Sequence, residues 1–306
     1  MKVLVAGATG AVGRPLVRQL LDQGHEVYGL TRSAEGVAKL GAVPVVADAL
    51  DQAALLAAVD GVRADAVVHQ LTALKKVPTR ESGMAATNRL RTTGTENLLA
   101  AARAMGATRF VSQSFYGGYG YRDNGDRPLT EDAPFGTGDG PFRATVGAMG
   151  AAERMIFDAP DIEGISLRYG NFYGPGAVEG MLDALRSRKF PMASGGVVPW
   201  TYIDDAATAT IAALELGRGG EAYNICDDAP ASFEEVVAEL VALWHTPKPI
   251  RLPGPLVRLA APYAGVLVTR TNTRLSTTKA QTTLGWTPTH PTYQAALRQT
   301  HELLGD

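Results

Sequence analysis

Residues 2–14 of this chain, Lys-Val-Leu-Val-Ala-Gly-Ala-Thr-Gly-Ala-Val-Gly-Arg, decide its fold. The apolar residues 3–6 predict a strand that is buried on both faces. Gly7, Gly10 and Gly13 follow at three-residue spacing, and apolar residues then recur on one face of a predicted helix. A buried strand, a glycine turn and a helix in this order are typical of a dinucleotide-binding site.

Each glycine of this turn has its own physical task in that interpretation. Gly7 permits the tight turn, Gly10 keeps a Cβ out of the path of a pyrophosphate, and Gly13 lets the helix pack closely on the strand. The N–H groups at the start of the helix would face the phosphates. The alternative is a structural glycine turn without a ligand. The turn residues that we expect to contact the dinucleotide are Gly7, Thr9, Gly10, Ala11, Val12 and Gly13.

The composition narrows the classes of partner. The chain has 306 residues with 29 basic and 31 acidic side chains, a balance that gives no sign of nucleic-acid or membrane binding. One cysteine, Cys226, rules out an internal disulfide framework, and the histidines show no metal-ligand spacing. The chain begins on a predicted core strand without a charged leader, so we expect a cytoplasmic protein. The apolar stretch 256–268 is too short to span a bilayer.

The end of the second predicted strand, residues 25–30, bears on the choice of cofactor. An acidic residue there would bind the ribose hydroxyls of NAD, whereas this chain has Thr31, Arg32 and Ser33, which suit a 2′-phosphate. The sequence therefore favours NADP over NAD, unless Arg32 is an ordinary surface charge. After a third strand at 43–47, Asp48 and Ala49 are candidates to contact the adenine, although Asp48 equally suits a local turn.

Strands and helices continue to alternate, with further strands predicted at 66–69, 109–113 and 165–169. This alternation predicts an α/β fold with a doubly wound parallel sheet and a ligand at the carboxyl ends of the strands. Helices are predicted at 88–105 and 145–158. The connection 115–143 is rich in glycine, tyrosine and proline, which favours a lid over a site. His69 ends its strand at the same edge of the sheet, and we interpret it as a buried, hydrogen-bonded residue.

Several motifs together resemble the extended short-chain dehydrogenase/reductase superfamily, the group that contains NAD-dependent epimerases and dehydratases. The resemblance covers nearly the whole chain. It rests on the glycine turn, on Asn88 with Gly-Thr-Glu-Asn-Leu-Leu at 94–99, on Phe110-Val111, on Arg-Tyr-Gly-Asn-Phe-Tyr-Gly-Pro-Gly at 168–176, on Tyr-Ile-Asp-Asp at 202–205, on Tyr-Asn-Ile at 223–225, and on Leu-Gly-Trp-Thr-Pro at 284–288.

This resemblance implies a Rossmann-type domain at 1–170, to which the chain returns at about 201–226. It also implies a smaller substrate-binding region, formed by 171–200 and 227–306. Similar proteins often form homodimers through the helices that correspond to 88–105 and 145–158. Asn171 matches a family position beside the substrate.

The chain departs from the family at the catalytic positions. The family uses a serine or threonine together with a Tyr-x-x-x-Lys motif, in which the tyrosine exchanges a proton with the substrate and the lysine lowers its pKa. In this chain Phe115 stands at the serine position, Thr145 at the tyrosine position and Met149 at the lysine position. None of the seven lysines has a tyrosine four residues before it. All three family roles are therefore vacant.

Other residues are candidates to replace them. Tyr116 is our candidate for the proton donor, Lys75 is a second candidate, and Ser114 is placed to orient a substrate carbonyl. Gln113 is a candidate cofactor contact. The alternatives are that the tyrosines pack in the lid and that Ser114 and Gln113 make local turn contacts. The residues that we expect to contact the substrate are Phe115, Tyr119, Thr145, Met149 and Asn171.

These observations favour an NADP-dependent oxidoreductase of atypical mechanism that acts on a small organic carbonyl or alcohol. A sugar-nucleotide epimerase or dehydratase is disfavoured, because those reactions depend strongly on the missing tyrosine and lysine. A protein that binds NADP without turnover, as a sensor, stays open. A non-redox enzyme on the same fold, such as a cyclase or lyase, also stays open.

Overall fold

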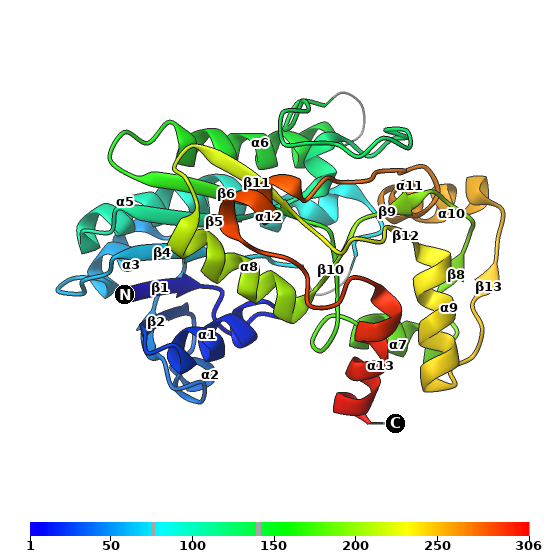
Figure 1. Cartoon of the computed structure of the whole chain (residues 1–306), viewed down its shortest axis with the longest axis horizontal. Helices are drawn as coiled ribbons and strands as arrows, with labels where there is room; N and C mark the ends of the chain where they lie inside the picture. Colours follow the sequence, from blue (N-terminus) through cyan, green and yellow to red (C-terminus); the bar gives the residue numbers. More distant parts are fainter. Residues whose placement is uncertain (75–76, 139–141, 306) are drawn as a thin grey trace.

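The computed structural model describes residues 1–74, 77–138 and 142–305. Seven parallel strands form one sheet in the order β11-β6-β5-β4-β1-β2-β3 (Figure 1). The strand order reverses between β1 and β4, which is the point where ligands bind in doubly wound sheets. The strands are β1 (Lys2–Ala6), β2 (Glu26–Thr31), β3 (Val43–Val46), β4 (Ala66–His69), β5 (Arg109–Phe115), β6 (Glu163–Tyr169) and β11 (Glu221–Ile225).

Helices cover both faces of the sheet, and the sequence of β1 shows why. Val3 and Val5 point into one apolar cluster, whereas Leu4 and Ala6 point into another, as the period of two in a strand requires. The first cluster is covered by α1 (Gly13–Asp22), α2 (Ala34–Ala38), α8 (Ile203–Leu216) and α12 (Thr278–Leu284). The second is covered by α3 (Gln52–Ala58), α5 (Thr95–Met105) and α6 (Arg143–Phe157) (Figure 1). The predicted doubly wound α/β fold is therefore confirmed.

The predicted helix at 88–105 is not uniform. It starts as a short 3-10 turn, Glu81–Met84, continues as α4 (Ala85–Arg89), widens into a π-helical segment at Leu90–Gly94 and resumes as α5. π-Helical turns of this kind often occur at functional sites.

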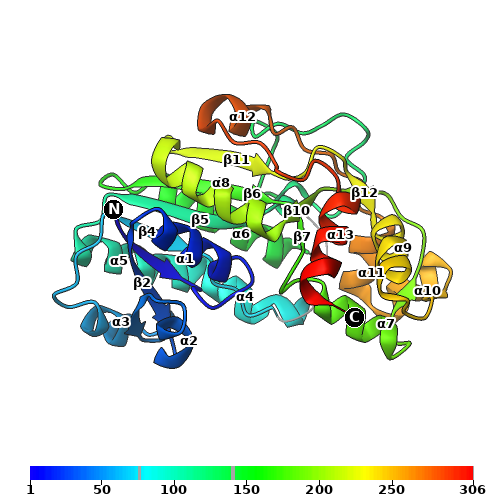
Figure 2. The same cartoon turned by 60° about the horizontal axis from the view of Figure 1, so that its bottom comes forward.

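A second body of helices lies beyond the carboxyl ends of the sheet strands (Figure 2). Its apolar core is a third cluster that also takes in the aromatic residues Tyr116, Tyr119 and Tyr121. The expected lid at 115–143 therefore begins with residues packed in a core. The helices of this body are α7 (Glu179–Arg186), α9 (Phe233–Trp244), α10 (Gly254–Ala260), α11 (Pro262–Thr269) and α13 (Tyr293–Leu304).

Within the described residues, three short strand pairs lie outside the seven-stranded sheet. These strands are β7 (Asn171–Tyr173) with β10 (Trp200–Tyr202), β8 (Pro191–Met192) with β13 (Ile250–Arg251), and β9 (Val197–Val198) with β12 (Ala231–Ser232). The loop after β7 reaches back to the glycine turn, because a Cβ on Gly176 would lie 3.7 Å from Ala11. None of the helices in the described part of the chain has both the length and the apolar character needed to span a bilayer.

Candidate active site

The glycine turn after β1 has the geometry that its spacing predicts. Gly7 has a φ of +95°, and a Cβ there would lie 2.8 Å from the Gln70 carbonyl oxygen. A Cβ on Gly13 would lie 2.0 Å from the Gly7 carbonyl oxygen, so α1 can approach this closely only with glycine. Gly10 differs, because a Cβ there would meet only the Gly7 oxygen, at 3.2 Å, among the described residues. The side of Gly10 is therefore open to a ligand, and the turn fits a dinucleotide.

The end of β2 leaves a cation exposed beside this turn. The Thr31 hydroxyl donates to the Ser33 carbonyl at 2.8 Å and accepts from the Ser33 N–H at 3.1 Å. Arg32 projects from this small turn, is exposed, and makes no hydrogen bond or ion pair with any described residue. A Cβ on Gly36 in α2 would lie 3.1 Å from the Thr9 methyl group, so α2 also borders the glycine turn. The arrangement suits a phosphate group near Arg32.

Asp48 and Ala49 follow β3 at the same edge of the sheet. One carboxylate oxygen of Asp48 accepts from the Leu50 N–H at 2.9 Å, which is the local turn contact considered above, and the side chain is exposed. Ala49 is buried, and its carbonyl accepts from the Asn97 side chain at 2.8 Å. Asn97 therefore fixes this loop from α5.

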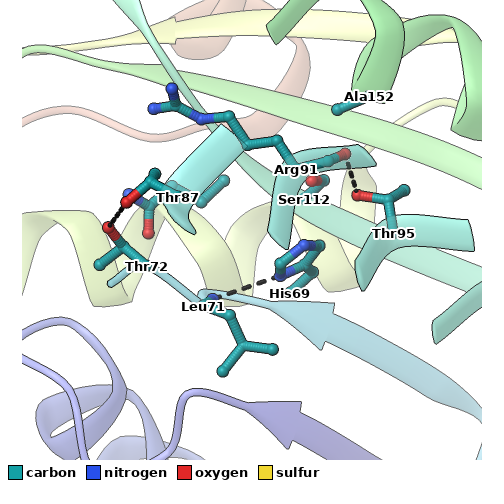
Figure 3. Close-up of a pocket in the computed structure, with 9 residues that line it drawn as sticks. His69, Leu71, Thr72, Thr87, Arg91, Thr95, Ser112 and Ala152 are labelled. Carbon is teal, nitrogen blue, oxygen red and sulfur yellow. Dashed lines mark hydrogen bonds between the residues drawn. The ribbon is translucent and has the colours of Figure 1, made fainter. Parts of the chain in front are cut away.

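A small cavity lies between the ends of β4 and β5 and the π-helical segment (Figure 3). His69 is held on both sides: its Nε2 donates to the Leu90 carbonyl at 3.2 Å, and its Nδ1 accepts from the Leu71 N–H at 3.2 Å. Burial lowers the pKa of His69 to about 4, so this residue is a neutral structural anchor. The cavity is lined by His69, Leu71, Thr72, Thr87, Arg91, Thr95, Ser112, Gln113 and Ala152.

The end of β5 carries three of the sequence candidates. Gln113 lines the cavity, and Ser114 is buried with a hydroxyl that has no hydrogen-bond partner among the described residues. Tyr116 is fully buried, and its hydroxyl accepts from the Asn171 side chain at 3.2 Å. Burial raises the pKa of Tyr116, so the phenol stays protonated. Phe115 is partly buried and packs on the Tyr116 ring, with 4.5 Å between ring centroids.

Tyr119 lies in a different environment. Its hydroxyl donates to Asn224 Oδ1 at 2.8 Å and accepts from Arg168 Nη1 at 2.8 Å. Burial raises its pKa to about 12. Hydrogen bonds within the protein already use this hydroxyl, so the proposed substrate site does not include Tyr119.

The two family positions on α6 hold no ionisable group. Thr145 is fully buried, and its hydroxyl accepts from the Asn88 side chain at 3.3 Å. Met149 is buried one turn further along α6. Lys75, the second candidate donor, lies outside the described residues.

Sequence reasoning missed Arg91, which lies on the π-helical segment and lines the cavity (Figure 3). Its Nη1 donates to Asn88 Oδ1 at 3.5 Å, and no carboxylate forms an ion pair with it within the described chain. Burial lowers its pKa, and the phenols of Tyr121 and Tyr263 oppose this effect. The available signal was a charged residue inside the helical motif that runs from Asn88 to Gly94-Thr95.

Comparisons with known proteins agree with this geometry. The chain is 39% identical to a 3-diazoavenalumate denitrifying reductase from a Streptomyces species, over 97% of this chain and 99% of that protein. It is 30% identical to a 2-alkyl-3-oxoalkanoate reductase from Stenotrophomonas maltophilia, over 81% of this chain and 77% of that protein. The fold matches that of Thermus thermophilus UDP-glucose 4-epimerase in complex with NAD, with a TM-score of 0.79 and 24% identity over 99% of this chain and 98% of that one.

A family model supplies the last comparison. The model of the NAD-dependent epimerase/dehydratase family matches residues 3–226, which include both family positions on α6 and all of the sheet except Lys2. A site for a nicotinamide dinucleotide is therefore supported by the fold, the glycine turn and the relatives together. The chain belongs to the NAD-dependent epimerase/dehydratase family.

Proposed function

We propose that this protein is an NADPH-dependent reductase that transfers hydride to a small organic acid without the family's tyrosine and lysine. The observation that carries the proposal is the pairing of a complete glycine turn with Thr145 and Met149 at the two catalytic positions of α6. Both reductases reported above act, by their names, on acid anions. We therefore place the substrate between the ends of β4, β5 and β6, next to Ser114, Thr145 and Asn171.

The chain's own residues set the chemistry that this site can perform. A bound nicotinamide dinucleotide would supply the hydride. Reducing a ketone also requires a proton for the new hydroxyl group. The loss of such a donor typically costs about a hundred- to ten-thousand-fold in rate. A substrate that accepts hydride without a proton fits this site better.

An aromatic diazonium group is such a substrate. The hydride forms a new bond to the ring carbon that carries the diazonium group, and the carbon–nitrogen bond breaks. Dinitrogen leaves with the electron pair of that bond, so no proton is needed. The denitrifying reductase that is 39% identical to this chain acts, by its name, on a diazo compound. We therefore propose a diazo acid as the first substrate class.

Reduction of an oxo acid is the second candidate, favoured by the similarity to the 2-alkyl-3-oxoalkanoate reductase. In that reaction Tyr116 is the candidate proton donor, with Ser114 orienting the carbonyl. Burial raises the pKa of Tyr116 and makes it a weak acid, and the hydrogen bond that Asn171 donates to the phenol oxygen opposes this effect only in part. The geometry thus supports this candidate less well than the first.

One experiment separates the candidates. The purified protein is mixed with NADPH deuterated at C4 and either 4-carboxybenzenediazonium or 3-oxooctanoate, with protein-free mixtures as controls. Enzyme-dependent deuterium in benzoate supports the diazo candidate, and deuterium in 3-hydroxyoctanoate supports the oxo candidate. No deuterium in either product, with NADPH still bound, contradicts reductase activity and favours the sensor or the non-redox enzyme.

The preference for NADP rests on Arg32 and has its own test. Arg32→Asp removes the cation and offers a carboxylate that suits ribose hydroxyls, so NADPH binding should weaken by about 10- to 100-fold while NADH binding does not weaken. Nicotinamide fluorescence titrations measure both affinities. Equal weakening of the two would contradict the assignment. The domain division at residue 170, pairing of two chains through α5 and α6, and a cytoplasmic location stay predictions.

A further inference from the structure

Arg91 is held at its place by the irregular helix around it. The π-helical segment interrupts the regular helical hydrogen bonds, and nearby side chains take up the carbonyl groups. Thr92 Oγ1 donates to the Asn88 carbonyl at 3.0 Å, and Thr95 Oγ1 donates to the Arg91 carbonyl at 2.7 Å. His69 donates to the Leu90 carbonyl between them. The backbone that carries the Arg91 side chain is therefore fixed on both sides.

Arg91 forms no ion pair within the described residues, because the nearby Glu81 carboxylate instead accepts from the Thr145 N–H at 3.2 Å. An arginine stays protonated, and a partly buried charge without an anion costs free energy. The nearby phenols of Tyr121 and Tyr263 do not neutralise it. Their hydroxyls are hydrogen-bonded to each other at 2.7 Å, and burial raises the pKa of both, so both stay neutral. A guanidinium in this position lacks an anionic partner.

The position of Arg91 connects it to the site of reaction. Arg91 donates to Asn88 Oδ1, and Asn88 Nδ2 donates to Thr145 Oγ1. Thr145 stands at the family's tyrosine position, where the group that meets the substrate would normally lie. One residue, Asn88, therefore bridges the Arg91 guanidinium to that position. Figure 3 shows Arg91 on the same cavity as Thr72, Thr87 and Ser112.

We propose that Arg91 binds the carboxylate of the substrate and so restricts this enzyme to acids. This inference rests on the proposed function and adds the residue that selects the substrate class. A guanidinium matches a carboxylate with two parallel hydrogen bonds, which a lysine cannot reproduce.

Binding without turnover tests the inference directly. The protein is loaded with NADP⁺, and its affinities for cinnamate and for the neutral amide cinnamamide are measured by calorimetry. We expect the wild-type protein to bind cinnamate about 10- to 100-fold more tightly than the amide, as a charge-assisted pair requires. Arg91→Met should remove this preference, and Arg91→Lys should keep part of it.

Arg89→Met is the matched control. Arg89 lies two residues earlier on the same helix, is exposed, and its side chain forms no hydrogen bond or ion pair with a described residue. This variant should keep the full preference. Arg91→Met should also unfold at the same temperature as the wild type or at a slightly higher one, since it breaks no ion pair and removes a charge that burial destabilises. If the wild type shows no preference for cinnamate over cinnamamide, including no binding at all, or if Arg91→Met keeps the preference, the inference is wrong.

The outcome is separable from that of the proposed function. An Arg91-dependent preference for cinnamate without any hydride transfer would leave the acid site standing and refute the reductase. Hydride transfer, together with equal affinities for acids and for their amides, would support the reductase and refute the acid site.

Discussion

Arg168 and Arg91 both bring a positive charge into the interior, but among the described residues only Arg168 forms an ion pair there. Arg168 donates from Nε and Nη2 to the two carboxylate oxygens of Glu153 at 3.0 and 2.7 Å, and from Nη1 to Tyr119 and to the Glu131 carbonyl. Its guanidinium also lies 3.7 Å from the centroid of the Phe135 ring. Arg91 has one long hydrogen bond to an amide.

The difference separates structure from function within one molecule. Burial alone would lower the pKa of Arg168, but the hydrogen bonds and the charge of Glu153 outweigh it and raise that pKa. The cluster of Arg168, Glu153, Ser166 and Tyr119 is closed, because its polar groups satisfy one another. The open site contains Arg91 and the unpartnered hydroxyl of Ser114. An unpaired buried polar group in a native protein needs an explanation, and a catalytic or binding role is one such explanation.

The largest effect that tests this comparison is expected at the closed cluster. Arg168→Met leaves the Glu153 carboxylate buried without its cation, and Glu153 is only 7% exposed. We expect a loss of about 3–5 kcal/mol in the free energy of unfolding. Urea denaturation measures this loss. The double variant with Glu153→Met should recover most of it, because a buried pair replaced by apolar residues is nearly neutral.

Arg103→Met is a suitable control for that experiment. Arg103 also pairs with a carboxylate, that of Asp161, but the two side chains are 44% and 51% exposed and water can solvate both. We expect the control to lose less than about 1 kcal/mol. Equal losses for the two variants would show that the closed cluster is no more important than a surface pair.

The second effect concerns pH and the anchor of the open site. The pKa of His69 is about 4 in the folded protein and 6.5 in an unfolded chain, so its contribution is fully present above pH 6.5 and is lost as the pH falls toward 4. Over this window the wild type should lose roughly 3 kcal/mol more stability than His69→Gln. Urea denaturation at a series of pH values measures both profiles. Parallel profiles would mean that His69 becomes charged without unfolding cost.

The sequence predicted the sheet because its signals are local. Alternating burial in β1 and the spacing of Gly7, Gly10 and Gly13 are properties of neighbouring residues, and the structure gives each of them the expected geometry. The capping box at the start of α9, with Ser232 and Glu235, is local in the same way.

The partners of buried side chains could not be predicted, because they come from distant parts of the chain. Tyr116 and Tyr119 are three residues apart, yet Tyr116 meets Asn171 in the proposed site, whereas Tyr119 belongs to the closed cluster and meets Asn224. Arg91 escaped notice because an arginine on a helix is usually solvated. The π-helical segment that carries it has no clear signature in the sequence.

The smallest effects come from two serines that sharpen the comparison atom by atom. Ser166 donates to Glu153 at 2.7 Å inside the closed cluster, so Ser166→Ala should cost about 1.5–3 kcal/mol. Ser114 is equally buried but its hydroxyl has no partner among the described residues, so Ser114→Ala should leave stability unchanged or raise it slightly. If Ser114 serves a ligand, its variant should instead weaken NADPH or substrate binding, which Ser166→Ala should not. Thermal unfolding with and without NADPH measures both, and a stability loss at Ser114 as large as that at Ser166 would mean that the open site is closed by contacts within the protein.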